Sequence, residues 1–214
     1  MIQALDYANR IRGLYVLTDR STSGGRSHVD ICRAAVVGGA SLVQLRAKDM
    51  EAADAVAVAK EMAGICKAAS VAFLVNDRVD IAMASGADGV HLGPGDMEPA
   101  DARRLMGPEA IIGASVASVA EGRAAEPFAS YFGVGAVFGT TTKGDAGAAI
   151  GTARLVELKC AYPGMPIVAI GGINASNIHF VRETGVEAAA VISAVTGADD
   201  MASATRALVD AFRG

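Results

Sequence analysis

Eight short apolar segments alternate with eight helical patterns along the chain, and this alternation constrains the fold more than any other feature. The apolar segments are rich in β-branched residues and lie at 14–18, 42–46, 72–76, 89–93, 111–115, 132–138, 167–171 and 189–193. The helical patterns between them are rich in alanine and lie at 28–38, 51–68, 77–85, 98–106, 118–126, 152–161, 174–183 and 199–213. Strands this apolar, without polar alternation, are covered on both faces, which is typical of parallel sheets.

Eight strand–helix units in 214 residues indicate an α/β protein with a (β/α)8 barrel, the TIM-barrel architecture. A doubly wound open sheet accommodates the same alternation and stays the alternative. The sequence has no linker, low-complexity tract or break in composition, so we expect a single domain over residues 1–214. The opening MIQALDYANRIRG has the pattern of a short N-terminal amphipathic helix and lacks the order of a signal peptide.

Charge and composition narrow the classes of partner. The formal net charge of −4 provides no basic field for nucleic acid or an anionic membrane. No apolar run approaches the ~18 residues that a membrane span needs. Cys32, Cys66 and Cys160 are widely spaced and odd in number, so we interpret them as buried thiols of a reducing compartment. We therefore expect a cytoplasmic protein that acts on small molecules, and homo-oligomerisation is left open.

Polar side chains follow the predicted strands at the end where the loops of a barrel converge on its active site. Each has a simpler explanation when it is taken alone. Arg46 and Lys48 could be solvated loop charges, and Asp77 or Asp96 could cap the helix that follows. Their coincidence at one rim favours a site. The candidates are Gln44, Arg46, Lys48, Asn76, Asp77, Asp96, Ser115, the run TTTK at 140–143, GGIN at 171–174 and Ser193.

This combination of cations and paired carboxylates has a specific chemical use. Mg²⁺ is held by one or two carboxylates together with substrate phosphate oxygens, which suits Asp77 and Asp96. Arg46, Lys48 and Lys143 would neutralise the remaining charge of a pyrophosphate. The backbone N–H groups at AIGGIN (169–174) and VISAV (191–195) predict a second anion site, the phosphate cradle of this fold.

The same residues resemble a known family. The chain is similar to the thiamine phosphate synthase family over nearly its whole length. The segments that carry the resemblance are LYVLTD, LVQLRAKD, LVNDRVDIA, GADGVHLG, GVGAVFGTTTK, VAIGGI and AVISA. The family couples hydroxymethylpyrimidine diphosphate to thiazole phosphate and releases pyrophosphate, so the resemblance implies a Mg²⁺-dependent transferase with these two small-molecule substrates.

The resemblance also implies roles for individual residues. It assigns the pyrimidine diphosphate to Gln44, Arg46, Lys48, Asn76, Ser115 and Lys143, of which Arg46, Lys48, Ser115 and Lys143 are expected to act in catalysis. It assigns Mg²⁺ to Asp77 and Asp96. It assigns the thiazole phosphate to Thr140, Thr141, Thr142, Gly172, Ile192 and Ser193.

Two features of the sequence concern the predicted site: a departure from the family pattern near Asp96, and the positions of the histidines. Pro94–Gly95 stands where the family usually has Gln-Glu, which could shift the loop of Asp96. A neutral thiazole nitrogen needs no general base, in agreement with a rim that we expect to lack histidine. His91 lies within a strand pattern and is interpreted as structural.

Three other functions are weighed against the synthase. A thiazole tautomerase or regulatory relative would need a histidine shortly after the fifth strand, where this chain has Ala117. A sugar-phosphate isomerase or aldolase would need a catalytic Lys or Glu inside the barrel. A non-enzymatic phosphate-binding barrel would have little use for two metal carboxylates.

Overall fold

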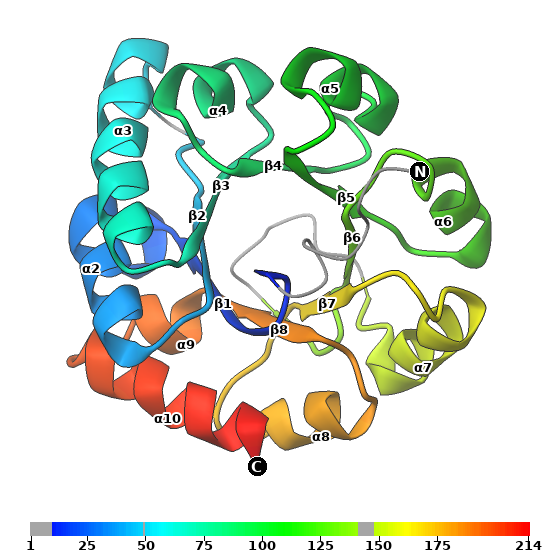
Figure 1. Cartoon of the computed structure of the whole chain (residues 1–214). Helices are drawn as coiled ribbons and strands as arrows, with labels where there is room; N and C mark the ends of the chain where they lie inside the picture. The colour runs from blue at the N-terminus through cyan, green and yellow to red at the C-terminus, as the bar shows by residue number, and fades with distance from the viewer. Residues whose placement is uncertain (1–9, 49, 141–147) are drawn as a thin grey trace.

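The strands form a closed parallel barrel. The computed structural model describes residues 10–48, 50–140 and 148–214. Within them each strand pairs with the next in sequence, and β1 pairs with β8 to close the ring (Figure 1). This confirms the (β/α)8 barrel and excludes the doubly wound sheet. The strands are β1 (Gly13–Thr18), β2 (Leu42–Leu45), β3 (Ala72–Asn76), β4 (Gly89–Leu92), β5 (Ile111–Ser115), β6 (Tyr131–Val134), β7 (Ile167–Ile170) and β8 (Ala188–Val191).

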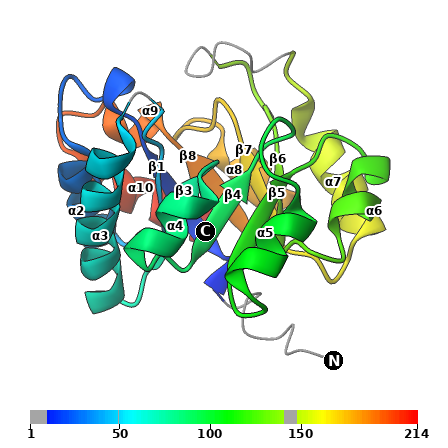
Figure 2. The same cartoon turned by 90° about the horizontal axis from the view of Figure 1, so that it is seen from above.

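Helices surround the strands on the outside, as the two perpendicular views show (Figures 1 and 2). They bury one face against the barrel and begin after loops at the carboxyl ends of the strands. The described helices are η1 (Arg20–Thr22), α2 (His28–Gly38), α3 (Ala52–Ala68), α4 (Val79–Ser85), α5 (Pro99–Met106), α6 (Val119–Ala125), α7 (Gly151–Ala161), α8 (Ile178–Glu183), α9 (Ser193–Thr196) and α10 (Met201–Arg213). The expected N-terminal helix falls mostly on residues 1–9, outside the described ranges.

Alternation along the strands separates two apolar cores. Successive side chains of a strand point to opposite faces of the sheet. Alternate residues of each strand therefore pack outward against the helices or inward inside the barrel. In β2, Leu42 belongs to the inner core and Val43 to the outer one. Gln44 lies two residues after Leu42 and therefore also faces inward. Inward-facing residues of neighbouring strands lie around the barrel axis in the same way. Those near the carboxyl ends of the strands form the floor of a pocket.

Helix boundaries depart from the sequence-based expectation at α8. The pattern at 174–183 predicts a helix from Asn174, whereas α8 begins at Ile178. The side chain of Asn174 accepts a hydrogen bond from the Ser176 backbone N–H (2.9 Å), and that of Asn177 accepts one from the Asn174 N–H (2.8 Å). Such local side-chain bonds compete with the helical ladder, so this segment forms a turn before the helix.

The cysteines only partly follow the expectation of three buried thiols. Cys32 and Cys66 are buried, but Cys160 is exposed. Leu155 and Leu158 form the buried face of α7, and Cys160 lies off that face. Among the described residues, no helix combines the length and apolar composition that crossing a membrane requires.

Candidate active site

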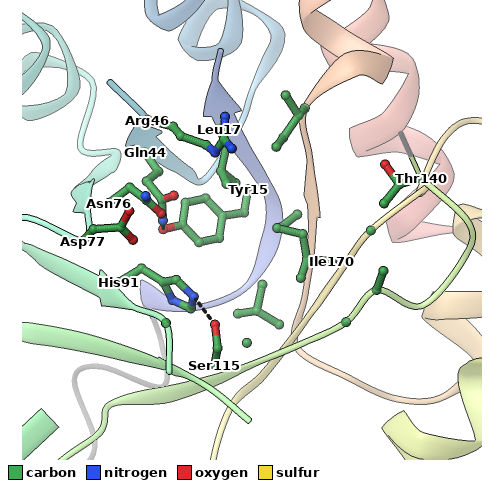
Figure 3. A pocket seen from close by; sticks show the side chains of 18 of the residues that line it. Tyr15, Leu17, Gln44, Arg46, Asn76, Asp77, His91, Ser115, Thr140 and Ile170 are labelled. Atoms are coloured by element: carbon green, nitrogen blue, oxygen red, sulfur yellow. Dashed lines mark hydrogen bonds between the residues drawn. The ribbon is translucent and has the colours of Figure 1, made fainter. Parts of the chain in front are cut away.

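A single cavity of about 500 Å³ brings the predicted site residues together at the carboxyl ends of the strands (Figure 3). Thr141, Thr142 and Lys143 lie outside the described residues, so their predicted roles stay predictions. Of the other candidates, Asn174 at the end of the GGIN run does not line the cavity. The rest line it: Gln44, Arg46, Lys48, Asn76, Asp77, Asp96, Ser115, Thr140, Gly171, Gly172, Ile173, Ile192 and Ser193.

Asp77 and Asp96 form a carboxylate pair. Burial, a hydrogen bond that protonated Asp77 donates to the Asp96 side chain and the charge of Asp96 raise the pKa of Asp77 to about 6, against the opposing effect of Lys48 and Arg46. The loop containing Pro94–Gly95 keeps Asp96 in the site, because its Oδ2 accepts a hydrogen bond from the Gly93 N–H at 2.7 Å. The two carboxylates form a pair of oxygen ligands for a divalent cation, and below about pH 6 the cation would displace a proton from them.

Neither aspartate has the simpler role of a helix cap. The N-cap of α4 is Arg78 and that of α5 is Glu98. Asp77 instead has a left-handed backbone, with φ of 64°, a conformation uncommon for residues other than glycine and often found at functional sites. The backbone thus turns after β3 in a way that presents this carboxylate to the cavity.

Arg46 is fixed by a carboxylate that the sequence analysis did not identify. Its Nη1 donates to Oδ2 of Asp19, and both side chains are largely buried, with exposed fractions of 14% and 5%. The other Asp19 oxygen accepts from the Ser21 backbone N–H (2.9 Å) and hydroxyl (2.6 Å). A single aspartate directly after β1 does not indicate a partner for Arg46 in the sequence, because an aspartate at this position is also expected as a helix cap. Asp19 does cap η1.

The described charges that line the cavity do not add up to a basic pocket. Arg46 and Lys48 are the cations, and Asp77, Asp96 and Glu121 are the carboxylates. Glu121 was not predicted; its carboxylate accepts from the Ala117 N–H at 2.8 Å in the loop after β5. A polyanion placed here would meet two described cations against three carboxylates, so its binding requires further positive charge.

A buried polar chain crosses the floor of the cavity. Gln44 Nε2 donates to the Tyr15 hydroxyl (2.6 Å), and the Tyr15 and Tyr131 hydroxyls are 3.3 Å apart. His91 Nδ1 lies 2.9 Å from the Tyr131 hydroxyl, and its Nε2 lies 3.0 Å from Ser115 Oγ (Figure 3). The cavity thus includes a histidine on its floor, below the rim that was expected to lack one. His91 lines the cavity because position 91 has the inward parity of β4.

A glycine turn after β7 forms another wall of the cavity. Gly172 has φ of 66°, and a Cβ atom there would lie 2.5 Å from the Gly139 carbonyl oxygen. Only glycine suits both the left-handed backbone and this close approach. Ile192 and Ser193, at the start of α9, line the same cavity. Residues of two consecutive βα loops thus line the cavity where the sequence predicts a phosphate cradle.

Comparison with known proteins gives a family for this arrangement. A family model described as thiamine monophosphate synthase matches residues 14–195. A thiamine-phosphate synthase from Methanoculleus marisnigri is 46% identical over 198 residues, which cover 92% of this chain and 93% of that protein. One from Roseiflexus castenholzii is 48% identical over 202 residues, covering 93% and 88%.

A solved structure agrees in fold and in sequence. The thiamine phosphate pyrophosphorylase from Pyrococcus furiosus superposes with a TM-score of 0.87 and 39% identity, covering 97% of this chain and 98% of its own. The match therefore covers nearly the whole chain.

Proposed function

The chain belongs to the thiamine monophosphate synthase family, and we propose that it couples hydroxymethylpyrimidine diphosphate to thiazole phosphate to form thiamine phosphate and pyrophosphate. It is a transferase that makes a C–N bond. The observation that supports this most directly is the convergence of Asp77, Asp96, Arg46 and Lys48 on one cavity that also holds the Gly172 turn. A diphosphate and a monophosphate thus have separate sets of partners at opposite loops.

The carboxylate pair supports magnesium as the cofactor. Within the described ranges no three His, Cys, Asp or Glu side chains group closely enough to hold a metal by themselves. At phosphates, Mg²⁺ is usually held by one or two carboxylates together with substrate oxygens and water, and Asp77 and Asp96 provide such a pair. When bound, Mg²⁺ would neutralise the charge that develops on the departing pyrophosphate. Asp77 and Asp96 would hold it.

The other residues divide between the two substrates. Arg46 and Lys48 would bind the diphosphate, and the Asp19 carboxylate keeps the Arg46 guanidinium in place before the substrate arrives. The remaining assignments follow the family resemblance. Gln44, Asn76, Ser115 and Lys143 would contact the pyrimidine diphosphate, and Thr140, Thr141, Thr142, Gly172, Ile192 and Ser193 would contact the thiazole phosphate.

A dissociative mechanism suits these groups. The bond from the pyrimidine methylene carbon to the diphosphate oxygen breaks first, and both electrons leave with pyrophosphate. The electron-rich aminopyrimidine stabilises the methylene cation, which the lone pair of the thiazole nitrogen then attacks. The fixed charges of Arg46 and Lys48 assist by stabilising the leaving group, the kind of preorganised electrostatic effect that dominates many enzymes. No proton transfer to a general base is needed.

The activity has a direct test. The protein is incubated with both phosphorylated precursors and Mg²⁺, and thiamine phosphate and pyrophosphate are quantified. We expect equal amounts of the two products. Formation of neither product by folded protein would refute the synthase function. The tautomerase alternative is disfavoured because Ala117 stands in the loop after β5, where that activity would need a histidine.

Metal dependence should follow the ionisation of the carboxylate pair. EDTA is expected to abolish coupling and Mg²⁺ to restore it. Because the pKa of Asp77 is raised to about 6, a metal ion must displace a proton below that pH. The affinity for the metal ion should then fall by about tenfold for each pH unit below 6, and it should be constant above about pH 7. Titration of Mn²⁺, followed by electron paramagnetic resonance without diphosphate, measures this, and a constant affinity from pH 5 to 8 would contradict it.

The Gly172 turn can be tested against a glycine of the same backbone conformation. Gly172→Ala should raise the KM for thiazole phosphate by about tenfold or more, because the added methyl group meets the Gly139 carbonyl oxygen and displaces the cradle. Gly185 also has a left-handed φ, of 75°, but has no atom within 4 Å of an added Cβ. Gly185→Ala should therefore lower stability, because alanine is strained in a left-handed backbone, but it should leave the KM for thiazole phosphate unchanged. Equal KM values for the two variants would refute the cradle assignment.

A further inference from the structure

The polar chain on the floor of the cavity joins two side chains that line it, Gln44 and Ser115. It runs from Gln44 through Tyr15, Tyr131 and His91 to Ser115. The two tyrosines and Gln44 are at most 2% exposed, whereas Ser115 is exposed to the cavity. An inner core position of a barrel is normally apolar. Five consecutive polar side chains at such positions therefore need an explanation beyond packing.

Two glycines of the neighbouring strands leave the space that the rings of this polar chain occupy. A Cβ atom at Gly113 would lie 2.2 Å from Tyr131 Cζ and 2.5 Å from His91 Nδ1. One at Gly133 would lie 2.6 Å from His91 Cε1. The His91 and Tyr131 rings stack with centroids 5.5 Å apart in the space that these glycines leave. The rings are thus held in one arrangement, and the hydrogen bonds between them are fixed with it.

Counting protons gives the chain a direction. Burial raises the pKa of both Tyr15 and Tyr131, so each hydroxyl keeps one proton. The Tyr15 hydroxyl accepts from Gln44 and therefore donates to Tyr131, which in turn donates to His91 Nδ1. Neutral His91 then carries its proton on Nε2 and donates to Ser115 Oγ. Any other pattern with this Gln44 orientation leaves a buried hydroxyl proton without an acceptor, which is costly.

The two ends then have opposite polarity toward the ligand. The Ser115 hydroxyl proton is directed away from His91 Nε2 and is available as a donor. Gln44 Oε1 is a buried acceptor that has no partner among the described residues. Reversing the chain would instead leave buried amide N–H groups unpaired at Gln44, and unpaired buried donors are rarer in proteins than unpaired carbonyls. The direction from Gln44 to Ser115 is therefore favoured before a ligand binds.

We propose that this relay makes the cavity selective for a 4-aminopyrimidine over a 4-oxopyrimidine, with Tyr15, Tyr131 and His91 acting as positioning residues. An aminopyrimidine offers an N–H donor to Gln44 Oε1 and a ring-nitrogen acceptor to Ser115. The 4-oxo analogue places a carbonyl where the amino group lies and a ring N–H beside it. It can be accepted only if Gln44, both tyrosines, His91 and Ser115 all reverse. The inference rests on the proposed function, since it concerns the pyrimidine substrate of that reaction.

Selectivity is measured with hydroxymethylpyrimidine diphosphate and its 4-oxo analogue, each with Mg²⁺. We expect the wild-type protein to bind the amino compound about a hundredfold more tightly, which corresponds to the cost of leaving one buried polar group unpaired against the wrong ligand. Tyr131→Phe removes the central hydroxyl and keeps the ring. Each end can then turn independently to suit either ligand, so the preference should fall to about tenfold or less.

Tyr162→Phe is the matched control. Tyr162 is also buried and donates its hydroxyl proton, to the Val119 carbonyl, but it lies outside the cavity. It should keep the hundredfold preference. If the wild-type protein binds both analogues equally, or if folded Tyr131→Phe keeps the full preference, the relay does not set selectivity.

Nitrogen chemical shifts of the His91 ring provide a readout that a purely structural role would not change. We expect the proton on Nε2 in the wild-type protein and a mixture of tautomers in Tyr131→Phe. A wild-type proton on Nδ1 would overturn the proposed direction. These measurements use binding and spectroscopy alone. A protein that selects the amino compound but forms no thiamine phosphate would therefore refute the synthase function and leave the relay supported.

Discussion

Asp77→Asn is expected to lower kcat/KM for coupling by about a thousandfold and, in the same protein, to raise the melting temperature measured without metal. The loss of activity follows from removing one of two carboxylates that would hold the cation at the departing pyrophosphate, a contribution of several kcal/mol to transition-state stabilisation. Asparagine is a better probe than alanine. Asp77 has φ of 64°, and asparagine tolerates this left-handed backbone well.

The gain in stability follows from the sign of the pKa shift. Because the pKa of Asp77 is raised from 3.8 to about 6, the folded state holds a proton more tightly than the unfolded chain. That contribution to stability is fully present below pH 4 and is lost as the pH rises through 6. At pH 7.5 the ionised pair therefore opposes folding, and a neutral amide removes this repulsion. If the substitution raises the free energy of unfolding by about 1 kcal/mol, we expect the melting temperature to rise by about 2–4 °C at pH 7.5 and not to change at pH 4.

Asp80→Asn is the control for both measurements. Asp80 lies three residues further along, is exposed, and pairs with Arg78 at 2.5 Å. An exposed ion pair of this kind contributes less than about 1 kcal/mol. This variant should keep its activity and should not gain stability at pH 7.5. Near-wild-type coupling by Asp77→Asn would contradict the metal assignment, whereas lost activity without a gain in stability would contradict the carboxylate pairing in the metal-free protein.

The fold and the rim of the site could be predicted because both depend on local patterns. Fully buried parallel strands read as apolar runs, so every strand was found within a few residues of its observed bounds. Polar residues just after those runs must converge once the barrel closes. Asp77 and Asp96, 19 positions apart, therefore meet as predicted, and the departure at Pro94–Gly95 does not move Asp96 out of the cavity.

The floor of the site could not be predicted in the same way, because it depends on contacts between strands. His91 pairs in register with Gly113, and Gly113 pairs with Tyr131, so the stacked rings follow from the stagger of β4, β5 and β6. Sequence reasoning had no access to that stagger. The glycines at 113 and 133 were the available signal, since glycine within a strand often marks a close approach by another group. Asp19 was missed because one carboxylate after a strand usually indicates no more than a cap.

Arg46→Met is expected to lower kcat/KM by about a hundredfold and to lower the free energy of unfolding by about 2–3 kcal/mol. The activity falls because a cation that binds the diphosphate is lost. The stability falls because methionine keeps the volume of the side chain but leaves the Asp19 carboxylate, which is 5% exposed, without its cationic partner. Breaking a buried ion pair from one side costs this much because an uncompensated charge remains.

Adding Asp19→Asn to Arg46→Met should separate the two effects. The double variant removes the uncompensated charge, so it should recover most of the lost stability while its activity stays low. Asp19→Asn alone should leave Arg46 poorly oriented, and it should raise the KM for the diphosphate more than it lowers kcat. Denaturant unfolding and steady-state kinetics on the same preparations measure both quantities. Arg33→Met is the control, since the Arg33–Glu61 pair is more than half exposed and should matter little to either. If the stability losses of Asp19→Asn and Arg46→Met simply add, the two side chains are not coupled, and Asp19 does not position Arg46 for catalysis.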